Sequence, residues 1–263
     1  MAKQSTRKSA PTAKRSMRLW SYLQRKHSVS RRDVIDMLSS DVVYINEELV
    51  TDRHRLIVDW DQLRITIPWQ SEPFTEDVQI RFMPPKLVLF HKPKWVVVSK
   101  DDPYNKTIYS LLPDSWKKDF WYIWRLDKES SWLMILTNQS RLVDRYENPH
   151  HNVYKVYEVE IDKRRHSRDA KRWVRGAWIT EDGKLQENDD QFAEHLKAVS
   201  ITYKYVNDKH YLIITLNEWK KRHIRRLLKW LWYWVRELKR VKVGKRSIGS
   251  LKPWAYTIQK KLR

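Results

Sequence analysis

Tryptophan occupies positions in this chain where a polypeptide usually needs glycine. The 263 residues include 15 Trp and only 4 Gly, whereas glycine ordinarily makes up about 7% of a globular protein. Trp60 separates two short apolar runs. Trp95 follows a Lys-Pro-Lys that lies between two further apolar runs, and Trp254 follows a Leu-Lys-Pro that precedes the last apolar run. Turns at such positions often require φ > 0, which a bulky residue adopts only with strain.

Two explanations account for these tryptophans. In the first, most of them are glycine codons read with the wrong genetic code, one that assigns UGA to Trp although the source organism reads it as Gly. In the second, the chain is rich in Trp because aromatic rings stack on RNA bases. The first explanation is favoured, because a stacking surface has no reason to select turns. UGG codons at Trp95, Trp124, Trp132 and Trp219 would exclude it.

The charge balance indicates a polyanionic partner. Lys and Arg total 53 against 32 acidic residues, which gives a formal net charge of +21. Each neutralised phosphate releases counterions, so nucleic acid is favoured over an anionic membrane surface as the partner. No apolar run approaches the ~20 residues that span a bilayer. The absence of cysteine excludes disulfides and Cys-based zinc sites, and we expect a cytoplasmic protein.

Residues 1–16 are interpreted as a disordered basic arm that contacts RNA. The segment carries five cations and no acidic residue: Lys3, Arg7, Lys8, Lys14 and Arg15. An organelle-targeting peptide has a similar composition and stays an alternative, although the segment lacks a clear apolar face.

Residues 17–67 predict a small module of two helices followed by short strands. We expect one helix over 17–25 and a second that Ser30 caps and that runs to about Ser39, with Asp33 at the third helical position. Strands are expected at 42–46, 56–58 and 63–67, with a turn at 47–48. Five cations lie near the two helices: Arg18, Arg25, Lys26, Arg31 and Arg32.

This module resembles the S4 RNA-binding domain. The family's Arg-Leu-x-x-Tyr-Leu is found at residues 18–23, its Ser-Arg-Arg at 30–32, and its strand-turn-strand at 43–50. The resemblance implies that the five cations of the module contact RNA. A generic basic helical hairpin is the alternative.

The rest of the chain predicts a second domain of the α+β class. Residues 68–85 contain four prolines and no periodicity, which indicates a linker. Asn207-Asp208 between two alternating runs indicates a hairpin, and strands joined by short turns favour a mixed, mostly antiparallel sheet flanked by helices over 86–263. We expect strands at 87–91, 96–99, 133–137, 154–161, 200–206, 211–216, 235–243 and 255–259, a helical turn at 107–112 and a helix at 220–231.

Asp127 is the candidate catalytic residue. It lies between Arg125 and Lys128, directly before the apolar run Leu133–Leu136. An aspartate between two cations is usually part of a solvated charge cluster. The apolar strand that follows and the two tryptophans that flank the segment, Trp124 and Trp132, instead favour a carboxylate held on a rigid edge.

The helix expected at 220–231 is a second candidate RNA contact. Four cations fall at i, i+3, i+4 and i+7, and an apolar stripe repeats the same spacing on another face. A cationic helix face is often only solvated, but this stripe contains no compensating acid, which favours phosphate contact. The four cations are Arg222, Arg225, Arg226 and Lys229. His223 belongs to no recognisable metal-binding spacing, and nothing indicates a metal enzyme.

Taken in order, these segments resemble the S4-domain ribosomal RNA pseudouridine synthases, and the resemblance covers nearly all of residues 17–259. With Gly written for Trp, residues 124–138 match that family's most specific signature, around Gly-Arg-Leu-Asp-Lys. Residues 87–99 match its opening strand, 155–159 its Lys-x-Tyr strand, 218–228 its basic helix and 244–253 its closing strands. The departures are the tryptophans, His223 in place of Gln, and a basic segment at 164–175.

The resemblance implies site-specific isomerisation of uridine to pseudouridine in ribosomal RNA. This reaction breaks the C1′–N1 bond and rejoins the ring through C5 without net redox change, so a carboxylate nucleophile suffices without cofactor or metal. Asp127 is then the nucleophile, at C1′ or at the base, and Arg225 pairs with it. Tyr157 stacks on the flipped base, unless it is an ordinary strand aromatic, and Arg125 steadies the RNA backbone.

Other classes of protein remain open. A monomer that acts on ribosomal RNA, free or in assembling subunits, is expected. A non-catalytic S4-type RNA-binding protein that assists ribosome assembly would explain the charge, but not why Arg-Leu-Asp accompanies a Lys-x-Tyr strand and an Arg-rich helix. An inactive relative is a third possibility if the tryptophans are real, because Trp124 and Trp132 would crowd the pocket.

Overall fold

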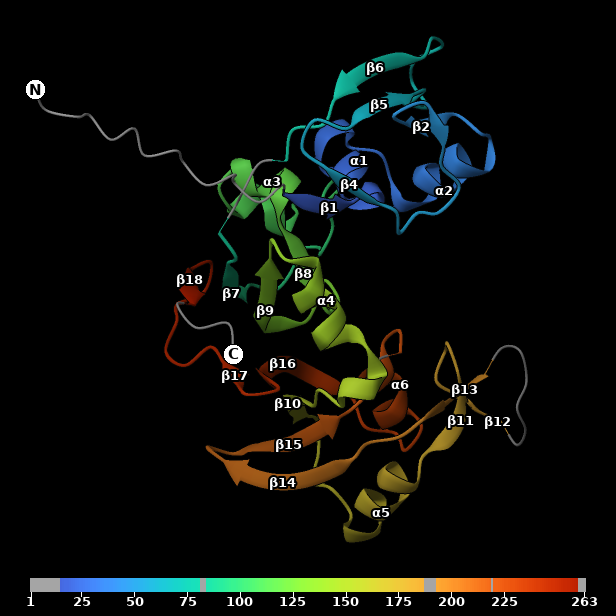
Figure 1. Cartoon of the computed structure of the whole chain (residues 1–263). Helices are drawn as coiled ribbons and strands as arrows, with labels where there is room; N and C mark the ends of the chain where they lie inside the picture. The colour runs from blue at the N-terminus through green and yellow to red at the C-terminus, as the bar shows by residue number, and fades with distance from the viewer. Residues whose placement is uncertain (1–14, 81–83, 187–192, 219, 260–263) are drawn as a thin grey trace, which may run out of the picture. The chain divides into compact units, whose positions relative to one another are not determined.

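The computed structural model describes residues 15–80, 84–186, 193–218 and 220–259. The chain divides into two compact units between Pro84 and Pro85 (Figure 1). Most of the expected basic arm and Trp219 lie outside the described residues. Ser16, which we assigned to that arm, instead begins the first strand, β1 (Ser16–Arg18).

The helices of the first unit form where the sequence predicts them. Helices α1 (Leu19–His27) and α2 (Arg31–Ser39) are separated by Ser28, whose φ of 59° ends the first helix. A reciprocal capping box starts α2: the Asp33 amide donates to the Ser30 hydroxyl over 3.1 Å, and the Ser30 amide donates to the Asp33 carboxylate over 2.6 Å. These two bonds satisfy amides that a helix start leaves without an intrahelical partner.

Short strands complete the first unit and correct one prediction. β1 pairs with β4 (Leu56–Val58), and a second sheet has the order β3-β2-β5-β6. Its strands are β2 (Val43–Ile45), β3 (Glu48–Leu49), β5 (Gln62–Ile65) and β6 (Phe74–Asp77). The prediction of a linker from residue 68 is therefore wrong, because β6 pairs with β5 and both Val78 and Ile80 are buried in the core of this unit.

The second unit is built on one mixed sheet with the strand order β14-β15-β10-β16-β9-β7-β18. All pairs in this order are antiparallel except β16 with β9, which confirms the α+β class and the mostly antiparallel sheet. Two further strands pair at its side, β8 with β9 and β17 with β16. The bounds are β7 (Leu87–Lys92), β8 (Trp121–Ile123), β9 (Ser131–Thr137), β10 (Lys155–Ile161), β14 (Ser200–Val206), β15 (Lys209–Leu216), β16 (Val235–Val243), β17 (Arg246–Ser247) and β18 (Tyr256–Gln259).

The expected helical turn at 107–112 is the 3-10 helix η1 (Ile108–Leu111), and the basic helix is α6 (His223–Lys229), shorter than predicted. The expected strand at 96–99 is wrong, because this segment makes only an isolated bridge between Val97 and Thr107. The sequence did not reveal several elements: α3 (Ser115–Asp119), α4 (Ser140–Glu147), η2 (Pro149–His151), α5 (Ser167–Arg175) and the separate sheet of β11 (Ala177–Thr180), β12 (Leu185–Gln186) and β13 (Ala193–Leu196).

Strand β9 lies inside the main sheet of the second unit, between β16 and β7. Met134 and Leu136 pack into the larger apolar cluster, while Leu133 and Ile135 pack into a smaller cluster made by the opposite set of side chains. Successive side chains of a strand point to opposite faces, so β9 is covered on both sides. The loop 124–130, which carries Asp127, leads directly into this rigid strand.

Six of the described tryptophans adopt the left-handed conformation that favours glycine. Their φ angles lie between 59° and 88°, and the four glycines of the chain lie in the same φ range or close to it. For a residue with a side chain this conformation costs roughly 1–3 kcal/mol. The six are Trp60, Trp95, Trp124, Trp132, Trp232 and Trp254.

Candidate active site

Asp127 lies in the loop between β8 and β9. Lys92, the last residue of β7, forms hydrogen bonds with the backbone of this loop. The Lys92 ammonium group is fully buried and donates to the carbonyl oxygens of Ser130 at 2.7 Å, Pro93 at 3.0 Å and Lys128 at 3.3 Å. The amide of Trp95 adds a bond to the Lys128 carbonyl at 2.7 Å. The backbone on the C-terminal side of Asp127 is therefore fixed to the sheet.

The Asp127 carboxylate is half-buried among positive charges. Burial raises its pKa, and the charges of Arg222 and Arg225 oppose this effect, with a smaller opposing contribution from Arg125. Glu129 adds a further upward influence, and the net pKa is higher than that of a solvated aspartate. The predicted cationic surroundings of this carboxylate are thus present, and two of the three arginines come from the start of α6.

Arg225 acts on Asp127 through its charge rather than through a direct ion pair. Among the described residues, the ion pairs within 4.0 Å do not include one between Arg225 and Asp127. The Arg225 Nε is buried, and it has no hydrogen-bond partner in the part of the chain that the structure describes. A buried donor in this state suits an incoming oxygen atom, from the Asp127 carboxylate or from a substrate.

Tyr157 faces the same site from β10, and its side chain is 0% exposed. Burial raises its pKa to about 12, while the charge and hydrogen bond of Arg240 lower it and the charge of Asp127 raises it. The ring therefore lies within electrostatic reach of the carboxylate. No face of this ring is accessible, so stacking on a base requires the side chains around it to move.

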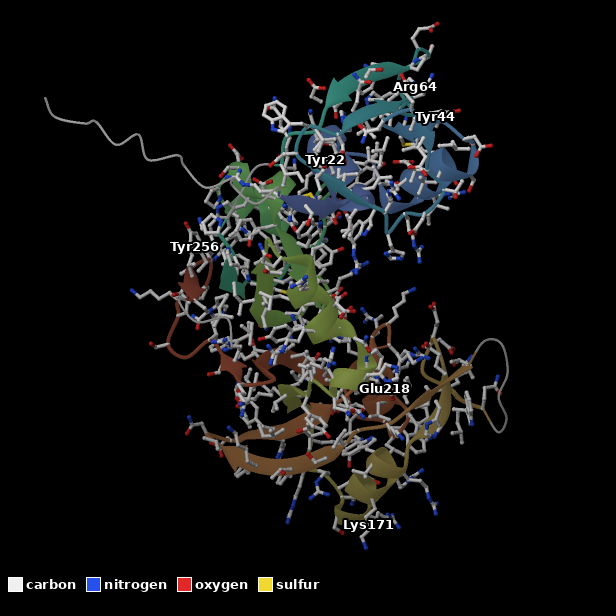
Figure 2. The ribbon with its side chains drawn as sticks, viewed as in Figure 1. Tyr22, Tyr44, Arg64, Lys171, Glu218 and Tyr256 are labelled. Carbon is white, nitrogen blue, oxygen red and sulfur yellow. The ribbon has the colours of Figure 1, made fainter. Side chains whose placement is uncertain are left out.

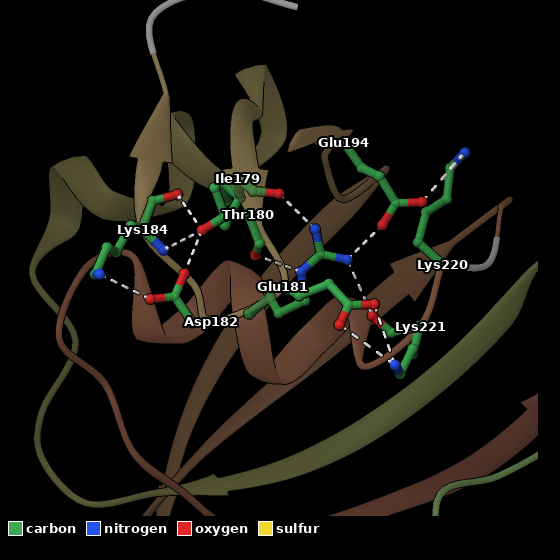
Figure 3. A network of polar contacts seen from close by, with 9 residues as sticks. Ile179, Thr180, Glu181, Asp182, Lys184, Glu194, Lys220 and Lys221 are labelled. Carbon is green, nitrogen blue, oxygen red and sulfur yellow. Dashed lines mark hydrogen bonds and ion pairs between the residues drawn. The ribbon is translucent and has the colours of Figure 1, made fainter. Parts of the chain in front are cut away.

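The side chain of Arg226, which we predicted to contact RNA, is held by protein groups in this structure. Its side chain is 4% exposed and its guanidinium donates to the carbonyl oxygens of Thr180, Ile179 and Lys221 and to the Glu194 carboxylate. Figure 3 shows this polar network, in which Glu194 also lies 3.8 Å from the Lys220 ammonium group. Arg226 thus links α6 to strands β11 and β13.

The other cations predicted on this helix lie in different surroundings. Arg222 adopts a φ of 52° before the first turn of α6 and reaches the Glu129 carboxylate at 3.5 Å. The Lys229 ammonium group donates to the Asp182 carbonyl at 2.6 Å. His223 is fully buried against the Lys197 carbonyl. Arg222 and Arg225 are therefore the two cations of the predicted stripe that act on Asp127.

The predicted RNA-binding residues of the first unit are mostly accessible. Arg32 is exposed, Arg18 lies 3.3 Å from His54, and Lys26 forms a 2.7 Å ion pair with Glu76. Arg25 is half-buried, and the side chain of Arg31 lies outside the described residues. In the second unit, Arg125 is exposed.

Sequence reasoning missed an aromatic and cationic pair in the first unit. The Arg64 guanidinium lies 4.0 Å from the centre of the Tyr44 ring, on directly paired positions of β5 and β2 (Figure 2). The signal was present as an aromatic residue and an arginine on two adjacent short strands, but their register could not be read from the sequence. Arg64 is exposed and Tyr44 is half-buried.

The described residues hold no group of three or more His, Cys, Asp or Glu side chains arranged to bind a metal ion. Within the same ranges, no helix has the length and apolar character needed to cross a membrane.

The Asp127 carboxylate, in the loop that leads into strand β9 of the mixed sheet, lies within electrostatic reach of Arg222, Arg225 and the buried Tyr157. The chain belongs to the RNA pseudouridylate synthase family, whose model matches residues 86–230. It is 22% identical, over 91% of its length and 94% of the relative's, to ribosomal small subunit pseudouridine synthase A of Vibrio vulnificus.

Two further matches describe the range of relatives. Ribosomal large subunit pseudouridine synthase B of Vibrio cholerae is 26% identical over 87% of this chain and 67% of its own length. A crystal structure of a pseudouridylate synthase aligns with a TM-score of 0.60 at 19% identity and covers 92% of this chain and 96% of that one. This structural match shows that the fold is shared.

Proposed function

We propose that this pseudouridine synthase isomerises specific uridines in ribosomal RNA, with Asp127 as the nucleophile. The observation that carries the proposal is the Asp127 carboxylate, in the loop that leads into β9 and within the field of Arg222 and Arg225. Relatives named for ribosomal RNA of both subunits support the substrate class. The subunit is left open, because the named relatives include enzymes of both kinds.

The chemistry needs little from the protein besides this carboxylate. The C1′–N1 bond breaks, the uracil ring is held and turned, C5 bonds to C1′, the C5 proton is released, and N1 takes up a proton. Asp127 adds to C1′ or to the base and is regenerated when the new bond forms. Arg225 offers its unpartnered Nε to the carboxylate or to an oxygen of the nucleotide, and Arg125 contacts the backbone phosphate. Tyr157 stacks on the extruded base once the side chains that cover its ring move aside.

We assign RNA binding to the first unit and interpret residues 17–67 as an S4 domain. Its two helices, capping box and following strands support this interpretation. Arg18, Arg25, Lys26, Arg31 and Arg32 are the cations through which this unit would bind phosphates, and the stacked pair of Tyr44 and Arg64 adds a surface for an unpaired base.

We also propose that the six tryptophans with positive φ are glycines in the natural protein. Their backbone angles support this reading, since glycine adopts them without strain. Trp173 is different: it is fully buried and its indole donates to the Leu227 carbonyl at 3.1 Å. We therefore expect UGA codons at the six positions and UGG at Trp173. The codons, or mass spectrometry of protein from the source organism, show whether these six residues are tryptophan or glycine.

The proposed reaction is tested on unmodified ribosomal RNA. We expect incubation with the protein to create pseudouridine at a small number of positions, and Asp127→Asn to prevent it without loss of RNA binding. A protein that binds ribosomal RNA but leaves every uridine unchanged, in both the Trp and the Gly forms, would instead favour a non-catalytic role in ribosome assembly. A monomeric, cytoplasmic protein stays a prediction, and light scattering tests the oligomeric state.

A further inference from the structure

Arg240 in β16 is a fully buried cation that contacts the loop before Asp127. Its Nε donates to the Leu133 carbonyl at 2.9 Å. One terminal nitrogen donates to the Trp124 carbonyl at 2.8 Å, and the other lies 3.4 Å from the Arg125 carbonyl. A single guanidinium therefore joins strand β9 to the two loop residues that come three and two positions before Asp127.

The same guanidinium also reaches the proposed base-stacking residue. Arg240 and Tyr157 occupy directly paired positions of β16 and β10, and the Arg240 guanidinium is near enough to the Tyr157 hydroxyl to act against the rise of its pKa that burial causes. On the other side Arg240 is paired in register with Trp132 of β9. The planar fork of an arginine can hold several acceptors in fixed directions at once, which an ammonium group cannot do.

The surroundings of Arg240 give it no electrostatic reason to be buried. Among the described residues, no carboxylate lies within 4.0 Å of it, and Lys92 and Lys155 are buried nearby with pKa values lowered to about 8, mainly by burial and in part by the charge of Arg240. Burying a charge without an opposite partner is strongly unfavourable. An apolar side chain in the sheet would avoid this cost, so the advantage of arginine lies in the groups that it holds.

We propose that Arg240 is a positioning residue for the isomerisation, which fixes the start of the Asp127 loop and the Tyr157 hydroxyl relative to one another. This inference rests on the proposed function, because it takes Asp127 as the nucleophile and Tyr157 as the residue against the base. A displacement of about 1 Å between reacting groups can cost ~100-fold in rate. Loss of the fork should therefore slow the chemical step and leave RNA affinity unchanged.

The test is Arg240→Lys, which keeps the charge and removes the fork. We measure single-turnover tritium release from ribosomal RNA labelled at C5 of uridine, the affinity for the same RNA, and thermal unfolding. Arg236→Lys is the matched control, because Arg236 lies on the same strand and is exposed. We expect a rate about 100-fold lower for Arg240→Lys at saturating protein, an RNA affinity within twofold of the parent protein, and an unchanged rate for the control.

Each outcome decides the matter. A folded Arg240→Lys protein with the parent rate, or one whose entire loss is a loss of RNA affinity, would overturn the positioning role. If Arg240→Lys does not fold, Tyr157→Phe decides, since it removes the hydroxyl on the position paired with Arg240 and keeps the ring: a slowed rate supports the role and an unchanged rate overturns it. An inactive parent protein would count against the proposed function, whereas an active parent with unaffected variants would count against the role of Arg240 alone.

Discussion

The ammonium group of Lys92 donates a hydrogen bond to the carbonyl oxygen of Ser130 across 2.7 Å. This bond links the last residue of β7 to the end of the loop that carries Asp127, and two further carbonyls of the same region complete the coordination of the ammonium group. The position of the proposed nucleophile thus depends on a lysine that substrate does not need to contact.

Lys92→Met should destabilise the second unit and slow the reaction. The variant leaves the buried carbonyl oxygens of Pro93 and Ser130 without this donor, whereas the Lys128 carbonyl keeps its bond from the Trp95 amide. Each unsatisfied group costs about 1–3 kcal/mol. We expect the free energy of unfolding to fall by about 2–4 kcal/mol in urea titrations. Lys94→Met is a suitable control, because Lys94 is partly exposed and pairs with Glu237 instead. Equal stability of the two variants would contradict the anchoring role of Lys92.

The buried lysines predict how stability depends on pH. Burial lowers the pKa of Lys92 and of Lys155 to about 8 in the folded protein, from 10.5 in a solvated lysine. Below pH 8 both states carry the protons, whereas between pH 8 and 10.5 the unfolded state binds more protons than the folded state. These groups therefore increase stability as pH rises through this window.

Urea unfolding at pH 7.5 and pH 9.5 measures this effect. Lys92→Met should show a smaller increase in stability between the two pH values than the parent protein, because one of the two titrating groups is gone. An increase of the same size in the parent protein and in the variant would rule out the assignment to Lys92.

Adjacent arginines on α6 should respond differently to substitution. Arg226→Met removes a buried donor from the carbonyls of β11 and from Glu194, so we expect a loss of about 3–5 kcal/mol in stability. Arg225→Met should keep the stability within about 1 kcal/mol and lower the single-turnover rate, since Arg225 acts on Asp127. Thermal unfolding and tritium release separate the two effects, and the reverse pattern would show that the roles are exchanged.

Two neighbouring tryptophans offer a matched test of the glycine hypothesis. Trp232 and Trp234 are both exposed, but only Trp232 has a positive φ, at 60°. Trp232→Gly should raise the free energy of unfolding by about 1 kcal/mol, because it relieves a left-handed conformation. Trp234→Gly should lower it by about 0.5–1 kcal/mol through the added freedom of the unfolded chain. Destabilisation by both substitutions would argue that Trp232 is native.

The sequence predicted the elements whose signals are local. The Ser30 and Asp33 capping box, the Asn207-Asp208 hairpin and the apolar strand at 133–137 each depend on residues close together in the chain, and all three are present. Strand β6 was missed because the prolines around it, Pro68 and Pro73, suggested a linker, whereas β6 is held by pairing with β5.

The different surroundings of two adjacent arginines on α6 could not be predicted for another reason. Arg225 and Arg226 follow one another in the sequence and share the same periodicity, so spacing alone assigns both to one cationic face. The carbonyls that bury Arg226 belong to β11, in a three-stranded insertion whose presence the sequence did not reveal. Tyr157 was assigned by resemblance, and its complete burial depends on neighbours from distant strands.

The most direct measurement is pseudouridine mapping after Asp127→Asn. The substitution keeps the size of the side chain and removes the charge, so we expect the single-turnover rate to fall by more than about 10³-fold while RNA affinity stays within twofold. Asp208→Asn, in the exposed turn of the β14–β15 hairpin, is the isosteric control and should react at the parent rate. Pseudouridine formed by Asp127→Asn at a rate similar to that of the control would contradict a nucleophilic role for Asp127.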